Sequence, residues 1–173
     1  MLRASGGCTP VWMAGATMRA RRSLSELGQV VEQYLGQMGL KVAPKENHLY
    51  MFKYGSTAVV ITLFEDEDAK HSFVRFSATT LSDFEPSMVF LQEILRLNSE
   101  VLFGSFLVFP DNTLSFSATL LGDKLDFEEF ETALNYVAQV SDDTDDLLQE
   151  VAGGHRATDL MNEFDTEEIA RLM

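Results

Sequence analysis

The sequence predicts an α+β fold in which helices pack on one antiparallel sheet. Apolar residues recur at helical spacing in three long segments and form strand-like runs in five shorter ones. Turn-forming and charged residues separate these runs, and their order along the chain is helix, three strands, helix, two strands, helix. A chain of 173 residues, of which 46% are hydrophobic, suits one domain with a single core.

The first predicted helix begins at Ser23, which has capping-box spacing to Glu26. Apolar residues continue at helical intervals to Met38, and Gly39 ends the pattern. Runs rich in aromatic and β-branched residues then predict three consecutive strands, over 49–54, 57–64 and 72–81.

The second predicted helix covers 88–97 and has Pro86 near its start. Its residues are apolar over most of the circumference, so it must be covered on more than one side. The cover is either the protein's own sheet and a loop or a second subunit. For a homodimer, the sequence predicts interface residues Leu91, Ile94 and Leu95.

A hairpin and a long helix complete the predicted domain. The hairpin strands are expected over 101–109 and 113–120, and the second of them alternates apolar and polar residues. Asp126 and Glu129 repeat the capping-box spacing before the last apolar stripe. This helix is expected to end at the glycine pair 153–154.

The two ends of the chain differ in composition from the predicted domain, residues 23–154. Residues 1–22 carry four arginines, no acidic residue and several Gly, Ser and Pro, which predicts a disordered leader. Its arginines mostly follow its apolar residues, the reverse of a secretory signal, and Met18 is a second possible start. Residues 155–173 form an acidic tail with one possible short helix.

Charge and cysteine content exclude several classes of partner. The net charge of −14 disfavours nucleic acid and anionic membrane surfaces, since both would repel the chain. The longest apolar run is much shorter than a membrane span. The only cysteine is Cys8, so no intrachain disulfide can form, and a reducing, cytoplasmic compartment is predicted.

No motif in the sequence predicts catalysis or a cofactor. Neither glycine pair joins a strand to a helix, as a phosphate-binding loop requires. Cys8 lies in the leader, away from any ordered base. One cluster could in principle bind a metal ion and make the protein a metal-dependent hydrolase: Glu65, Asp66, Glu67, Asp68 and His71. We interpret it as a solvated turn whose charges discourage strand aggregation.

Negative charge is concentrated in the last third of the chain. Residues 123–173 hold fifteen acidic and three basic residues. A solvated helix face that keeps the protein soluble is one interpretation. The other is electrostatic steering of basic partner segments toward this part of the molecule.

Several short motifs resemble those of a known family. They lie at the end of the second helix, at the start and turn of the hairpin, and at the start of the last helix: Leu95-x-Leu97-Asn98, Phe103-Gly104-Ser105-Phe106, Asp111-Asn112-Thr113-Leu114 and Leu125-Asp126-Phe127-Glu128-Glu129-Phe130. Over residues 23–154 the chain resembles the YbjN family, which is similar in fold to the type III secretion chaperones of Gram-negative bacteria.

The resemblance implies a non-catalytic, chaperone-like or regulatory protein that dimerises and holds extended client segments on apolar patches and sheet edges. It supplies no catalytic residues. We expect a client-binding sheet face that includes Phe52, Val60, Ile61 and Phe73. The alternative within the same fold is a chaperone dedicated to one type III effector. The acidic tail could fold back over the peptide-binding surface or exchange between subunits.

Overall fold

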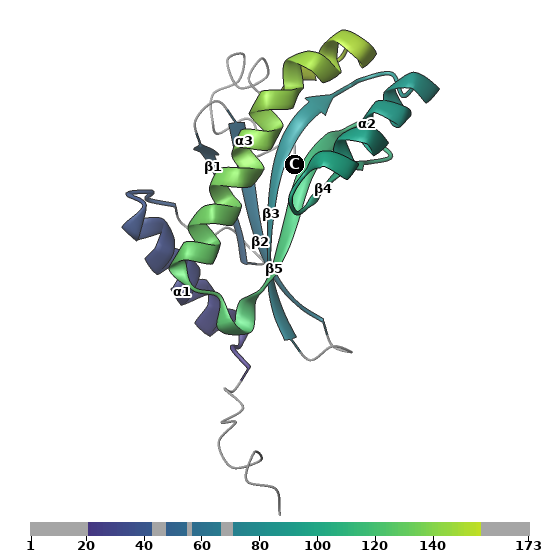
Figure 1. Ribbon diagram of the computed structural model, residues 1–173. Helices are drawn as coiled ribbons and strands as arrows, with labels where there is room; N and C mark the ends of the chain where they lie inside the picture. The colour runs from purple at the N-terminus through teal and green to yellow at the C-terminus, as the bar shows by residue number, and fades with distance from the viewer. Residues whose placement is uncertain (1–20, 43–47, 55–56, 67–70, 157–173) are drawn as a thin grey trace, which may run out of the picture.

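The computed structural model describes residues 21–42, 48–54, 57–66 and 71–156. Three helices accompany one antiparallel sheet, in the predicted order (Figure 1). The elements are α1 (Leu24–Gln37), β1 (Leu49–Tyr54), β2 (Thr57–Asp66), β3 (His71–Ser82), α2 (Met88–Glu100), β4 (Ser105–Val108), β5 (Leu114–Leu121), the 3₁₀ turn η3 (Gly122–Lys124), α3 (Phe127–Ala152) and β6 (His155–Arg156).

The strand order across the sheet is β1-β2-β3-β5-β4, and β6 adds to the end of β3. All pairs are antiparallel, with Tyr50 opposite Ile61, Ile61 opposite Phe76, and Phe76 opposite Ala118. Residues that lie directly opposite each other on neighbouring strands point to the same face of a sheet, so these four side chains share one face. The helices α1 and α3 lie over that face (Figure 1).

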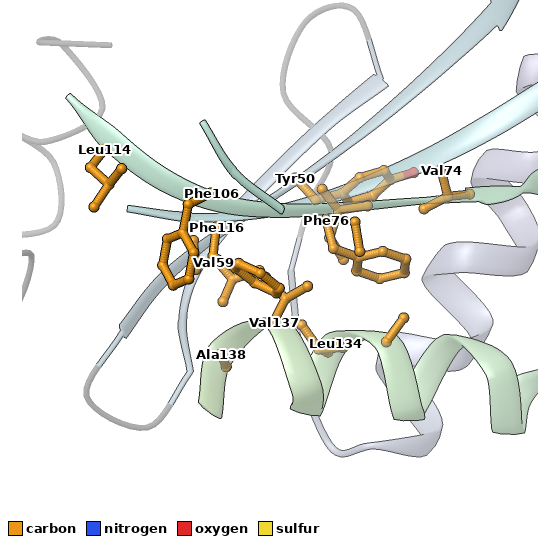
Figure 2. Close-up of a cluster of buried hydrophobic side chains, with 14 of the residues drawn as sticks. Tyr50, Val59, Val74, Phe76, Phe106, Leu114, Phe116, Leu134, Val137 and Ala138 are labelled. Atoms are coloured by element: carbon orange, nitrogen blue, oxygen red, sulfur yellow. The ribbon is translucent and has the colours of Figure 1, made fainter. Parts of the chain in front are cut away.

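The core fills the space between the sheet and α3. Side chains of β2, β3 and β5 point toward the helix, whose Leu134, Val137 and Ala138 point back at them (Figure 2). The rings of Phe76 and Phe130 meet edge to face, with centroids 5.2 Å apart. Among the described residues, no helix is long and apolar enough to span a membrane.

The first helix forms as the sequence predicts. Ser23 and Glu26 make both hydrogen bonds of the capping box, and Leu27, Val31 and Leu35 are buried. The hydroxyl of Tyr50 lies 3.4 Å from Glu32 Oε1, and burial together with this carboxylate raises the pKa of Tyr50 to about 12.

The last helix is a single segment of 26 residues. Asp126 and Glu129 form its capping box, and Gly153, with φ of 68°, ends it, both as the sequence predicts. Buried Ser141 lies midway along the helix and hydrogen bonds Thr80 on the sheet at 2.9 Å, so a polar residue continues the buried face there.

The prediction was wrong at two places in the sheet. The strand expected over 101–109 is ordered as β4 only over Ser105–Val108. Gly104 has φ of +85°, a backbone conformation that breaks the strand just before Ser105. A side chain is also excluded there, because an added Cβ would lie 2.7 Å from the Ser117 carbonyl oxygen. The short β6, in a segment predicted to be tail, pairs with Leu81 and Ser82.

Candidate functional site

The edge of β5 is partly open. β4 pairs with β5 only from Leu114 to Ser117, so within the described chain residues 118–121 have a neighbouring strand, β3, on one side only. Alternate residues of such a stretch direct their backbone N–H and C=O groups away from the sheet. These groups can pair with another extended chain.

A groove of about 340 Å³ lies beside this open edge, on the helix side of the sheet. Leu120 forms its floor at the sheet, α3 forms one wall, and the loop before β4 contributes an aromatic ring. The lining residues are Phe103, Leu120, Glu128, Glu129, Thr132 and Ala133. The open edge and this groove together are called the β5 site below.

The loop that contributes Phe103 is held firmly. The ring of Phe103 stacks on Tyr136, with centroids 4.6 Å apart. The Tyr136 hydroxyl accepts a hydrogen bond of 2.7 Å from the backbone N–H of Leu102. One wall of the groove is therefore preformed, which lowers the conformational cost of binding.

Two exposed carboxylates flank the groove. Glu128 and Glu129 belong to the first turn of α3, where the positive end of the helix dipole stabilises acidic side chains. Glu129 Oε2 also accepts a hydrogen bond from the Asp126 backbone N–H at 3.3 Å. No basic residue lines the groove in the part of the chain that the structure describes. The β5 site therefore combines an apolar slot with negative charge.

The N-terminal end of the described chain is fixed beside the β5 site. The guanidinium of Arg22 donates hydrogen bonds to the carbonyl oxygens of Gly122, at 2.9 Å, and Leu125, at 3.0 Å. Arg21 forms an ion pair of 2.5 Å with Glu65. Because Gly122 directly follows the open edge, residue 21 lies near the end of that edge.

The four residues predicted for a client-binding sheet face lie on two opposite faces of the sheet. Ile61 is completely buried beneath the helices, and Phe52 lies on the same face and packs against the core. Val60 and Phe73 lie on the opposite face, which none of the described helices covers. The four residues do not form one surface, because neighbouring residues in a strand point to opposite faces.

The open face of the sheet carries an aromatic cluster around Phe73. Its ring stacks on Phe64, with centroids 5.5 Å apart, and the Arg75 guanidinium lies 4.9 Å from the centre of the Phe64 ring. Leu121, from the end of β5, is 41% exposed on the same face. Exposed apolar residues thus continue from the β5 site onto this face.

The second helix presents one apolar face to solvent. Ile94 is 5% exposed and, with Phe90 and Leu97, faces the core, so its predicted place in a dimer interface was wrong. Leu91 and Leu95 are exposed, Leu95 by 70%, together with Met88 and Val89. Three apolar residues of β4 and its turn, Leu107, Val108 and Phe109, are also exposed, by 37 to 43%.

The residues considered for a metal cluster are described only in part, and no three metal-binding side chains come together among the described residues. Its members Glu67 and Asp68 lie outside the described residues. His71 Nδ1 instead lies 2.5 Å from Asp123 Oδ2, and Ser72 Oγ donates to Asp123 at 2.9 Å. Burial alone would raise the pKa of Asp123, but these hydrogen bonds together hold it below its ordinary value.

Comparison with known proteins places the chain in a family. Residues 25–160 match the family model described as "T3SS (YopN, CesT) and YbjN peptide-binding chaperone 1". The chain belongs to this family. Its predicted membership and its predicted class, a peptide-binding chaperone, are therefore confirmed. No sequence among the curated proteins matches the chain.

Solved structures confirm the predicted α+β fold. The ExsC–ExsE complex contains a chain that is 16% identical, with a TM-score of 0.59 over 72% of this chain and 95% of that one. A chain of the ExoU–SpcU complex from the Pseudomonas aeruginosa type III secretion system is 13% identical, with a TM-score of 0.55 over 69% and 98%. YbjN from E. coli is 15% identical, with a TM-score of 0.52 over 73% and 93%.

Proposed function

We propose that this chaperone binds an extended client segment at the β5 site. The client adds as a strand to residues 118–121 and inserts one apolar side chain into the groove. The observation that carries this proposal is the open edge directly beside a preformed apolar groove. Strand addition of this kind obtains affinity from backbone hydrogen bonds and selectivity from the pocket that receives alternate side chains.

The charge of the β5 site defines the client. A strand on the β5 edge directs every second side chain to the groove side, where Glu128 and Glu129 lie. A lysine or arginine two positions from the apolar anchor would lie close to these carboxylates. The net charge of −14 would also accelerate the encounter with basic segments. The preferred client segment therefore alternates apolar and basic residues with small or polar ones.

The open face supplies a second, weaker contact surface in this proposal. Val60, Phe73 and Leu121 offer apolar area to a client that crosses the end of β5 onto that face. Since Ile61 and Phe52 belong to the helix-covered side, they support the sheet and do not touch the client.

The chaperone acts without catalysis, cofactor or metal in this proposal, in the cytoplasm. The described side chains that line the β5 site are apolar groups, one threonine and two carboxylates, a set without histidine, cysteine or lysine. Cys8 as the single cysteine agrees with a reducing compartment.

A homodimer formed through α2 completes the proposed assembly. Met88, Leu91 and Leu95 recur at helical spacing on one exposed face of α2. Exposed apolar surface of this kind is typical of a subunit interface. A two-fold axis beside α2 would bring the same face of each subunit together.

Peptide binding to groove-filling variants tests the proposed function. The probe is a fluorescein-labelled ten-residue peptide in which valine and lysine alternate at every second position with serine between them, so that both face the groove. Its binding is measured by fluorescence anisotropy against a peptide with glutamate in place of lysine, and the two are called the valine–lysine and valine–glutamate peptides. Thr132→Trp fills the groove from the exposed face of α3 without removing a core contact. Gln139→Trp places the same side chain two turns along that helix, outside the groove.

We expect the valine–lysine peptide to bind the wild-type protein more tightly than the valine–glutamate peptide. Thr132→Trp should weaken its binding at least about tenfold, the effect of losing one buried anchor, while Gln139→Trp keeps wild-type affinity. Equal affinities for the two tryptophan variants would show that the β5 site is not where the client binds.

A further inference from the structure

We propose that the protein's own N-terminal segment, residues 1–20, occupies the β5 site in the same molecule and competes there with clients. This inference rests on the proposed function of the site. Three observations support it: where the described chain begins, the chemistry of residues 1–20, and the charge of the opposite end of the chain.

The described chain begins at the end of the open edge. Arg22 is hydrogen bonded to Gly122 and Leu125, so the segment before it starts beside the last residue of β5. Twenty extended residues span roughly 60 Å, whereas the four open residues of β5 span roughly 13 Å. The segment is long enough to reach every part of the groove.

Residues 1–20 combine an apolar stretch with positive charge and so share both general features of the proposed clients, although no arginine stands two positions from the apolar stretch. They include Arg3 and Arg19 and no acidic residue, and their most apolar stretch is Val11-Trp12-Met13. A tryptophan or valine suits a groove lined by Phe103, Leu120 and Ala133. The positive charge of the segment complements the negative charge around Glu128 and Glu129, for which the groove itself provides no basic partner in the described residues. Pro10 precedes the apolar stretch, and a proline is tolerated at the first position of a strand.

The C-terminal segment is the less suitable occupant. Residues 157–173 contain five acidic residues and one arginine, so the carboxylates of the groove would repel them. The described chain also ends at β6. This strand pairs with Leu81 and Ser82, at the end of β3 that lies away from the η3 turn. Charge and position therefore both favour the N-terminal segment.

Tethering makes even weak contacts effective. A short flexible tether gives an effective concentration in the millimolar range. An intrinsic dissociation constant of about 0.1–1 mM would then keep the site occupied for about 50–90% of the time. Client affinity falls by the fraction of free sites, so the expected weakening is about two- to tenfold. The segment would act as an internal competitor that a good client displaces.

Two unique residues allow a direct test on the full chain. Trp12 is the only tryptophan, so its fluorescence reports on its own surroundings. Cys8 is the only cysteine, so a nitroxide can be attached without other changes. Relaxation enhancement from this label identifies the amide groups near the segment. The far control is the end of α3, since Glu150 lies roughly 27 Å along the helix from Thr132.

We expect Trp12 to emit at shorter wavelength than free tryptophan in water, and to shift to longer wavelength when the valine–lysine peptide is added. Glu128→Lys should cause the same shift without peptide, whereas Asp143→Lys, exposed farther along α3, should not. The label at Cys8 should broaden amide signals of residues 118–121 and 128–133 and leave Glu150 sharp. A chain that begins at Met18 should bind the peptide about two- to tenfold more tightly.

The outcomes separate this inference from the proposed function. Water-like Trp12 emission with no broadening at the β5 site, or equal peptide affinity of the full and Met18 chains, would overturn it and leave client binding intact. Broadening seen only when labelled and isotope-enriched chains are mixed would assign the segment to a neighbouring copy and overturn the intramolecular arrangement. Absence of peptide binding by both chains would remove the proposed client site, while Trp12 and Cys8 would still report where the segment lies.

Discussion

Asn98 of α2 pairs with both backbone polar groups of Phe106 in β4. Its Oδ1 accepts a hydrogen bond of 2.7 Å from the Phe106 N–H, and its Nδ2 donates one of 3.3 Å to the Phe106 carbonyl. β4 is an edge strand, and unprotected edges invite pairing with other chains. The amide thus blocks strand addition at the middle of β4, while residues 118–121 of β5 stay open.

Removal of this amide should destabilise the protein and expose the β4 edge. In Asn98→Ala, the Phe106 N–H loses its partner in a half-buried position, which costs about 1–3 kcal/mol of unfolding free energy. Urea unfolding measures this loss. The control is Gln92→Ala, at an exposed position of the same helix, which should lower the unfolding free energy by less than about 0.5 kcal/mol. Equal midpoints for both variants would show that the Asn98 amide does not stabilise β4.

A buried pair of hydroxyl groups joins α3 to β3, and a double-mutant cycle can measure how much this pair contributes to stability. Thr80 Oγ1 and Ser141 Oγ lie 2.9 Å apart, and both residues are buried. Ser141→Ala should cost about 1–3 kcal/mol, because the Thr80 hydroxyl keeps no partner there. Adding Thr80→Val removes that unsatisfied group, so the double variant should be more stable than the sum of the two single losses predicts. Strict additivity would contradict a direct Thr80–Ser141 bond.

Buried Asp145 should make stability depend on pH. Burial raises its pKa above the ordinary value, and the neighbouring carboxylates of Asp146 and Asp142 add to this, against the backbone N–H of Asp146 and the charge of Arg156. The folded state therefore binds the proton more tightly than the unfolded state. The stability from this site is fully present below about pH 4, the unfolded pKa, and is lost as pH rises through the folded pKa.

Asp145→Asn cannot ionise and should remove that dependence. Relative to the variant, the wild-type unfolding free energy should fall as the pH rises above about 4, the unfolded pKa. Urea unfolding across this range measures the difference, with exposed Asp143→Asn as the control. A constant difference at all pH values would mean that Asp145 ionises equally in the folded and unfolded states.

Local sequence signals were sufficient for most of the fold. Ser23 with Glu26, and Asp126 with Glu129, predict helix starts that the structure confirms, because a capping box satisfies backbone N–H groups within four residues. The late start of β4 was not predicted, because seven of the nine residues over 101–109 are apolar and favour one continuous strand. The turn at Gly104 depends instead on close contact with the Ser117 carbonyl, which lies in another strand.

The site was less predictable than the fold. Phe103, Leu120 and Glu128 are far apart in the sequence and come together only because β4 begins as late as Ser105 and α3 starts beside the end of β5. Adjacent Val60 and Ile61 could have been assigned to different faces from strand alternation alone. The excess of acidic residues after Asp123 was the one sequence signal that indicated this region.

The outer face of α2 should control oligomeric state. Leu95 is 70% exposed, so Leu95→Asp removes apolar surface from the proposed dimer contact without disturbing the core. Ile94 is buried, and Ile94→Asp places an unpaired charge in the core, which should unfold the domain. Size-exclusion chromatography with light scattering should show a folded monomer for Leu95→Asp, and Leu91→Asp should act in the same direction.

A wild-type monomer, or a Leu95→Asp variant that keeps the wild-type dimer mass and its thermal midpoint, would rule out this face as the interface. Exposed Leu147→Asp on α3 is the control for loss of apolar surface elsewhere and should leave the mass unchanged. Ile94 and Leu95 are neighbours in α2, one buried and one exposed, so this pair separates a packing role from an interface role within a single turn of helix.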